Sequence, residues 1–249
     1  MFDSITLITI CLSFFAAGLV KGVIGLGLPI VSVALLTVFV GLQNALALLL
    51  IPALCTNIWQ GSVGGHAKTL LKKIWPFLTL AILFVWVGTL ALTRVDIPLL
   101  AAFLGLVLLI YSISNMVGFR IVINDTQNKW LGPILGILNG TITGMTGASA
   151  IPGVIYFQAR GLQRDEMIQA MGILFGLSTA SLAFSLGGNG LLKSELAIIS
   201  AFALVPSIAG MIIGQKIRKN LSEMLFRKIF FVALMLLGIY IILSAKPWA

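Results

Sequence analysis

Two stretches decide the fold: GLVKGVIGLGLP at Gly18–Pro29 and GILNGTITGMTGASAIP at Gly136–Pro152. Each is followed by a Gly-Leu-Gln triplet, which begins at Gly41 in the first case and at Gly161 in the second. The offset between the copies is 118 residues at the first two glycines and 120 at the triplets, so the length change falls inside the glycine-rich stretch. Glycine and proline breaks at matching positions of two hydrophobic halves are the best sequence indication of a transporter binding site.

The composition is that of a polytopic membrane protein. The chain is 59% hydrophobic and 9% charged, with a mean hydropathy of +1.13, whereas about a quarter of the residues of soluble domains are charged. Its apolar runs are continuous rather than alternating, which excludes a β-barrel. Membrane segments of this kind form helices, because a helix satisfies its own backbone polar groups. The predicted fold class is therefore all-α, with glycine-broken or re-entrant helices.

Breaks and charges together predict ten hydrophobic segments in two sets of five. The segments are 4–24, 27–40, 43–63, 74–92 and 97–117, then 131–145, 148–159, 166–188, 195–215 and 229–245. They define a first membrane repeat at 1–117, a cytoplasmic connector at 118–130 and a second membrane repeat at 131–249. Cys11 and Cys55 both fall inside apolar segments, where we expect small core residues rather than a disulfide.

The basic residues of the loops are distributed very unequally between the two sides. One set of loops holds Lys68, Lys72, Lys73, Arg120, Lys129, Arg160, Arg164, Lys216, Arg218, Lys219, Arg227 and Lys228, and the opposite set holds Arg94, Lys193 and Lys246. The positive-inside rule makes the first set cytoplasmic, so we expect both termini to face outward. It also accounts for the net charge of +9 without a nucleic-acid partner. Five segments per half then give the two halves opposite orientations, which is an inverted-topology repeat.

The segments at 27–40 and 148–159 are short. As helices they would rise about 21 and 18 Å, less than a hydrocarbon core of about 30 Å. Each is therefore either a half-helix that meets its neighbour inside the membrane or one arm of a re-entrant hairpin.

A helix that restarts inside the membrane offers free N–H groups and the positive end of its dipole to an anion. The breaks also carry neutral hydrogen-bonding side chains and one lysine. The predicted substrate-binding residues are Lys21, Gly25, Gly27, Asn139, Thr143, Gly144, Thr146, Gly147 and Ser149. Weaker candidates for lining a path are Asn57, Gln60, Ser178 and Ser181.

Structural alternatives stay open for several of these residues. The Gly-x-x-x-Gly pairs at Gly18/Gly22 and Gly136/Gly140 are also typical of close helix packing. Lys21 extends its amine to the inner interface if its helix starts near Ser4, and lies less than halfway across if the helix starts near Ser13. Threonine hydroxyls in membrane helices often bond their own helix backbone.

The acidic residues argue against a cation as cargo. All seven lie in loops or at segment ends, at Asp3, Asp96, Asp125, Asp165, Glu166, Glu195 and Glu223, whereas cation transporters usually keep a carboxylate within the membrane. We expect no metal site, no cofactor and no catalytic residue, and the chain has no Gly-x-x-x-x-Gly-Lys-Ser/Thr motif for ATP.

The doubled break with a nearby proline, the short chain and the two hydrophobic halves resemble the TauE/SafE family over essentially the whole sequence. This resemblance implies a permease for sulfite, thiosulfate or organosulfonates in the bacterial inner membrane. We therefore expect a secondary transporter for a small anion that works by alternating access, with homo-oligomerisation left open. The alternatives are a passive channel for small solutes and a membrane subunit of a larger complex.

Overall fold

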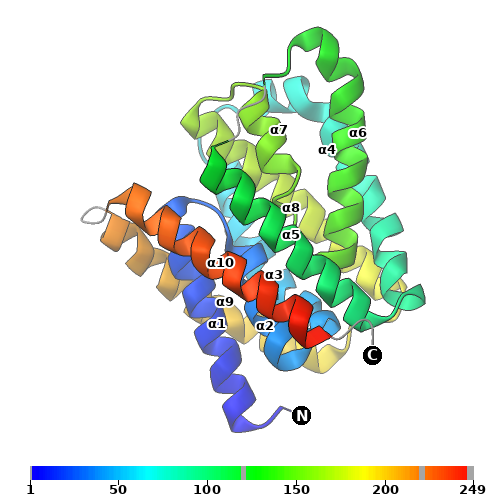
Figure 1. The fold of residues 1–249 in the computed structure, drawn as a ribbon, viewed down its shortest axis with the longest axis vertical. Coiled ribbons are helices and arrows are strands. Elements are labelled where there is room, and N and C mark those ends of the chain that lie inside the picture. The colour runs from blue at the N-terminus through cyan, green and yellow to red at the C-terminus, as the bar shows by residue number, and fades with distance from the viewer. Residues whose placement is uncertain (1, 119–121, 219–221, 246–249) are drawn as a thin grey trace.

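The computed structural model is helical throughout and describes residues 2–118, 122–218 and 222–245, with the backbone alone described at position 223 (Figure 1). The described residues form α1 (Ser4–Ile24), α2 (Leu28–Val40), α3 (Leu42–Ser62), α4 (Ala67–Arg94), α5 (Ile97–Val117), α6 (Asp125–Thr146), α7 (Gly153–Ala159), α8 (Arg164–Gly188), α9 (Ser194–Arg218) and α10 (Glu223–Ala245). Three of the basic loop residues, Arg120, Lys219 and Lys246, lie outside the described residues. The side chain of the acidic residue Glu223 also lies outside them.

Within the described part of the chain, seven helices are long and apolar enough to cross a membrane: α1, α3, α4, α5, α8, α9 and α10 from Met224 onward. The helix α2 has 13 residues and α7 has seven, which correspond to about 20 and 10 Å. Both are too short to span the core alone, as the sequence predicts.

In the second half, the starts of α6, α7 and α10 each differ from the prediction by five or six residues, and α10 begins at Glu223 instead of residue 229. The helix α6 begins at Asp125, inside the predicted connector, because Asn124 and Gln127 form a capping box in which each side chain accepts the other's backbone N–H. The predicted segment 148–159 is helical only from Gly153, since turns occupy most of the stretch between Gly147 and that residue.

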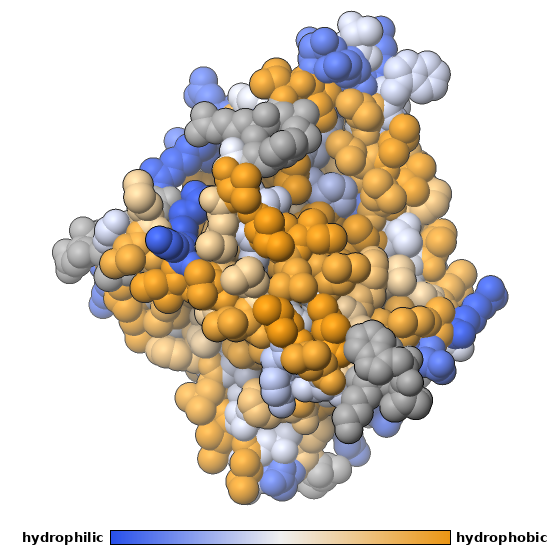
Figure 2. Space-filling view, in the orientation of Figure 1, coloured by the Kyte–Doolittle hydropathy of each residue, from blue (hydrophilic) through white to orange (hydrophobic). Residues whose placement is uncertain are grey.

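The outer faces of the helices are apolar. Large side chains such as Trp59, Phe184 and Phe202 are exposed, and Figure 2 shows apolar residues over most of one face, with hydrophilic residues gathered toward its ends and edges. A surface of this kind matches lipid tails. Cys11 and Cys55 also lie on the exposed surface, so the prediction that they are core residues is wrong.

Long helices pack in pairs that join the two halves: α1 along α9, α6 along α4, α5 along α10, and α3 along α8. Four glycines allow the first two pairs to approach closely. A Cβ would collide with a carbonyl oxygen of the facing helix at each of them: Gly18 with Ser207, Gly22 with Met211, Gly136 with Phe77, and Gly140 with Ala81. The packing alternative is confirmed for these four residues.

The core of the protein lies around α2, α3 and α8. In an apolar 18-residue stretch of each helix, 61% is buried inside the protein for α3 and for α8, against 28% for α9 and for α10. The short helix α2 packs on α3 with eight of its 13 residues buried. The two helix breaks are therefore held at the centre of the bundle, next to its most buried elements.

Candidate functional site

The first break joins α1 to α2 through Gly25, Leu26 and Gly27. Gly25 ends α1 with φ +87° and donates its N–H to the Lys21 carbonyl at 2.8 Å. Gly27 precedes α2 with φ +110°, a conformation that side chains disfavour, and Pro29 follows in the first turn, where its missing N–H costs nothing. Glycine is thus required on both sides of Leu26.

The second break is longer and is built differently. Gly147 ends α6 with φ +72° and donates its N–H to the Thr143 carbonyl at 2.7 Å. The chain then turns through Ser149 and Pro152 before α7 begins at Gly153. The two copies of the motif therefore give breaks of unequal length.

The two breaks meet each other. Gly27, Pro29 and Ile30 from the first break and Ser149 and Ala150 from the second line a common void with Phe175 of α8. The void measures about 10 Å³, which is barely room for a water molecule. The structure thus brings Gly27 and Ser149 together and shows the breaks closed on one another.

Two of the three hydroxyls predicted to bind the substrate donate hydrogen bonds to the backbone of their own helix. Thr143 donates its hydroxyl to the Asn139 carbonyl at 2.7 Å, and Thr146 donates its own to the Ile142 carbonyl at 2.7 Å. Thr146 also accepts the Ala148 N–H at 3.2 Å, which caps the helix end. Of the three predicted hydroxyls, Ser149 alone lines the void.

Gly144 has a packing role. It lies in the contact between α6 and α4, where a Cβ would collide with the Val85 carbonyl oxygen and crowd the Thr89 N–H. The structure does not bring it to the void.

Asn139 bridges the second break. Its side chain is fully buried, and its Oδ1 accepts the Gly153 N–H at 2.8 Å. This bond ties the first turn of α7 back to the middle of α6. Its Nδ2 has no hydrogen-bond partner among the described residues.

Lys21, which the repeat pairs with Asn139, reaches another helix instead. Its side chain is 4% exposed, and its Nζ donates to Thr56 Oγ1 at 3.1 Å and to Asn57 Oδ1, both on α3. Although α1 begins at Ser4, this side chain therefore points into the protein and does not extend to the surface. Among the described residues, no carboxylate lies within 4.0 Å of its amine.

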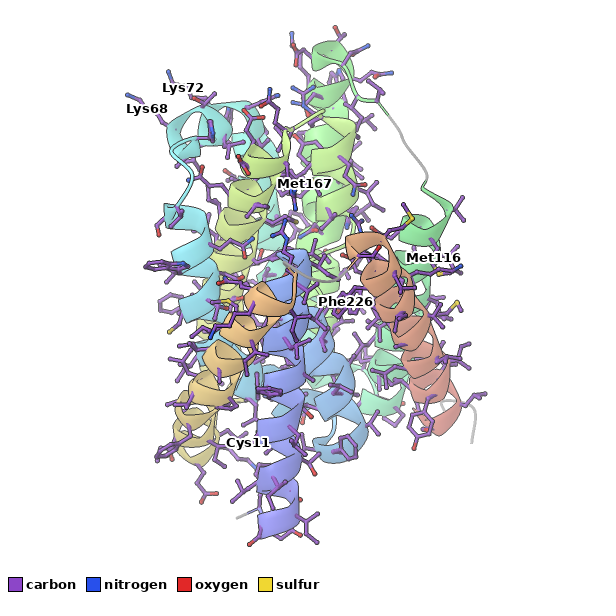
Figure 3. The ribbon with its side chains drawn as sticks, turned by 90° about the vertical axis from the view of Figure 1, so that its left-hand side faces the viewer. Cys11, Lys68, Lys72, Met116, Met167 and Phe226 are labelled. Atoms are coloured by element: carbon purple, nitrogen blue, oxygen red, sulfur yellow. The ribbon has the colours of Figure 1, made fainter. Side chains whose placement is uncertain are left out.

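A pocket of about 440 Å³ leads to Lys21 from one end of the bundle. Its walls come from the end of α1, the end of α3, the start of α8 and the end of α9, and they include Gly25, Gln60, Asp165 and Arg218. In Figure 3, α1 runs from the end of the molecule near Cys11 toward the end where Lys68 and Lys72 project. The pocket therefore opens toward the end that carries the basic loops.

Gln60 connects this pocket to the first break. Its Nε2 donates to the Gly25 carbonyl at 3.1 Å and to the Ile168 carbonyl at 2.8 Å. One amide thus holds the end of α1 against α8, at the boundary between the pocket and the closed void.

Sequence reasoning missed Thr56 as a partner of Lys21 and ranked Asn57 only as a weak candidate. The available signal was the adjacent polar pair Thr56-Asn57 in an otherwise apolar segment, four residues after Pro52. No motif connects this pair to Lys21, which lies 35 residues earlier in the chain.

Comparison with known proteins identifies a family. A family model described as "Sulfite exporter TauE/SafE" matches residues 10–241, which is nearly the whole chain. No curated protein and no solved structure matches.

Proposed function

Since the chain belongs to the TauE/SafE sulfite exporter family, we propose that it is a secondary transporter that moves a small sulfur-containing anion across the bacterial inner membrane. Proteins of this family are membrane transporters and not enzymes. The cargo class proposed for this chain comprises sulfite, thiosulfate and organosulfonates. The mechanism proposed is alternating access.

The pairing of helices supports an inverted repeat. Exchanging α1 with α6 and α4 with α9 turns the pair α1–α9 into the pair α6–α4, and both pairs use glycines at the contact. The pairs α3–α8 and α5–α10 each map onto themselves under the same exchange. With five helices in each half, the two halves have opposite orientations, and both termini face outward.

The observation that carries alternating access is the contrast between the two spaces at the first break. A pocket of about 440 Å³ reaches Gly25 from the basic end of the bundle. On the other side of Leu26, the breaks enclose about 10 Å³, too little for an oxyanion. In this proposal the conformation is open to the cytoplasm and closed at the centre, and cargo passes when the breaks separate.

The breaks have two roles in this mechanism. Gly25, Gly27 and Ser149 line the path of the anion. The other predicted residues hold the ends of α6 and α7 in place, so that the second break stays against the first. They are Asn139, Thr143, Gly144, Thr146 and Gly147. Assembly as a homo-oligomer or as a subunit of a larger complex stays a prediction.

The function is tested by uptake of radiolabelled thiosulfate into proteoliposomes that contain the purified protein. We expect saturable uptake that unlabelled sulfite and methanesulfonate inhibit and that choline does not. Protein-free liposomes are the control. Uptake that equals this control for thiosulfate, sulfite and methanesulfonate alike would overturn the proposed function.

A further inference from the structure

Lys21 is a buried amine whose partners are all neutral. It donates to a hydroxyl and to an amide oxygen, and the ion pair of Arg160 with Asp125 lies elsewhere. A buried charge is costly unless an opposite charge or several hydrogen bonds compensate it. The protein therefore buries this amine with no carboxylate at contact distance among the described residues.

Thr56 is fixed as an acceptor toward this amine. Its own hydroxyl donates to the Pro52 carbonyl at 2.7 Å, so the oxygen faces Lys21 with its lone pairs. Asn57 likewise presents its Oδ1 to the amine, while its buried Nδ2 has no partner among the described residues. An ammonium has three donors, and Lys21 lines the pocket together with Thr56.

We propose that the pocket of about 440 Å³ is the first binding site of the cargo, where the Lys21 ammonium contacts the anionic oxygen atoms of a sulfite, thiosulfate or sulfonate group. Asn57 and Thr56 are positioning residues that hold the amine before the cargo arrives. Gly25 leaves the wall beside Lys21 free of a side chain, and a Cβ there would meet nothing nearer than Ile168 at 3.9 Å, so a compact oxyanion reaches the amine. This inference rests on the proposed function and assigns the charge recognition to one residue.

The site is asymmetric between the two repeats. The position that matches Lys21 is Asn139, and its side chain oxygen is already bonded to the Gly153 N–H. Of these two matched positions, only Lys21 in the first half carries a charge, and it lies beside the pocket of about 440 Å³.

Charge variants of the site test the proposal. Lys21→Met removes the ammonium and keeps the length of the side chain, and Asn57→Asp places a carboxylate where the cargo would otherwise supply the negative charge. We expect each to raise the KM for thiosulfate by about 10-fold or more, the scale of one lost charge-assisted hydrogen bond. Lys21→Arg keeps the charge and is expected to lose less. Lys72→Met, at an exposed lysine of the same end, is the matched control and is expected to leave the KM unchanged.

The carboxylate of Asp165 provides a further control. Asp165 lines the wall near the opening, and we expect Asp165→Asn to keep the KM or lower it, because it removes a like charge from the path of the anion. A loss in Asp165→Asn equal to that in Lys21→Met would overturn the proposal, since it would make the two residues an internal pair.

A binding measurement separates this proposal from the proposed function. Thiosulfate is expected to raise the thermal unfolding midpoint of the detergent-solubilised wild type and of Lys72→Met, and to leave that of Lys21→Met unchanged. This readout does not require transport, so absent flux with a Lys21-dependent shift would overturn the function alone. An equal shift and an equal KM in wild type and Lys21→Met would overturn the assignment of Lys21. Lys21→Met is expected to fold, because an apolar side chain of similar volume replaces a buried charge without loss of packing.

Discussion

At the scale of single residues, the second break depends on Asn139. Its Oδ1 accepts the buried Gly153 N–H at 2.8 Å, and a Cβ at Gly153 would crowd the side chains of Asn139 and Leu174. Without the amide, the first turn of α7 would have a buried N–H and no partner. One side chain thus fixes the position of a seven-residue helix that is too short to be stable alone.

We expect Asn139→Ala to destabilise the protein by about 1–3 kcal/mol, the cost of leaving a buried hydrogen-bonding group unsatisfied. The midpoint of thermal unfolding in detergent measures this. Asn189→Ala is the matched control, because that side chain donates only to the Ser185 carbonyl at the end of its own helix. Equal midpoints for the two variants would contradict the role of Asn139.

The residues of the site were only partly predictable from sequence. Lys21 stood out as a charge inside an apolar run, and its burial agrees with a role inside the protein. Its partners on α3 depend on how two helices pack, and no local pattern encodes that packing. The bonds of Thr143 and Thr146 to their own helix were among the alternatives, and the sequence offered no means of choosing between them and a ligand role.

At the scale of elements, glycine contacts hold the long helices in pairs. A Cβ at Gly140 would collide with the Ala81 carbonyl oxygen of α4, and a backbone atom has little freedom to move away. By contrast, a Cβ at Gly187 of α8 would meet only Leu192 at 3.6 Å, an ordinary contact.

We therefore expect Gly140→Ala to destabilise the protein by about 1–3 kcal/mol through overpacking. Gly187→Ala is expected to be neutral or to stabilise it by up to about 1 kcal/mol, because alanine favours the helix. Thermal unfolding of both variants gives the comparison. An equal drop in the unfolding midpoint of both variants would contradict a close contact between α6 and α4 at Gly140.

An ion pair joins the first residue of α6 to the residue that follows α7. Arg160 Nη2 lies 2.6 Å from Asp125 Oδ1, and Arg160 Nη1 donates to the Ile123 carbonyl at 2.9 Å. The hydrogen bond and the charge of Arg160 hold the pKa of Asp125 below its usual value of 3.8. A carboxyl with a lowered pKa in the folded state contributes stability above its unfolded pKa and loses it as the pH falls through the folded one.

The wild type should therefore unfold at a slightly higher temperature than Asp125→Asn at pH 7, and this difference should shrink toward zero as the pH falls below 3.8. The effect is small because Asp125 is exposed to solvent. Asp96→Asn is a suitable control, since Asp96 makes no ion pair within the described residues. A difference that is independent of pH would exclude the charge of Asp125 as its cause.

Sequence patterns were sufficient for most elements and failed where the chain turns. Continuous apolar runs predicted every spanning helix, although α4 and α10 begin seven and six residues earlier than predicted. The short second segment was expected at 148–159, but helix occupies only Gly153–Ala159. A run of small apolar residues is compatible with both a turn and a helix, and the bond from Gly153 to Asn139 selects the start of the helix.

At the scale of the whole molecule, the inverted arrangement of the halves is tested by labelling from each side. Cys11 and Cys55 are exposed and must first be replaced by alanine. In that background, we expect a cysteine at Arg94 to react with a membrane-impermeant maleimide from outside only, and a cysteine at Gln163 from inside only. Both wild-type residues are exposed, so access is not limited by burial. Reaction of the two cysteines from the same face would contradict the inverted topology.

Composition, loop charges and the doubled break were enough to indicate a multi-pass transporter and its family. They gave no information about how the halves dock, because docking depends on contacts such as Gly18 with Ser207 that join residues far apart in the chain. The closed void and the one-sided pocket follow from that docking. Both are properties of the assembled bundle.

The central claim is that this chain carries a small anion by exposing one site to each side in turn. Counterflow tests it most directly: proteoliposomes loaded with unlabelled thiosulfate are diluted into a trace of radiolabelled thiosulfate. A carrier with one alternating site is expected to accumulate label transiently above its equilibrium level, and Lys21→Met is expected to reduce this overshoot. Label that rises only to equilibrium, at a rate that does not depend on the internal thiosulfate, would contradict alternating access and indicate a passive channel.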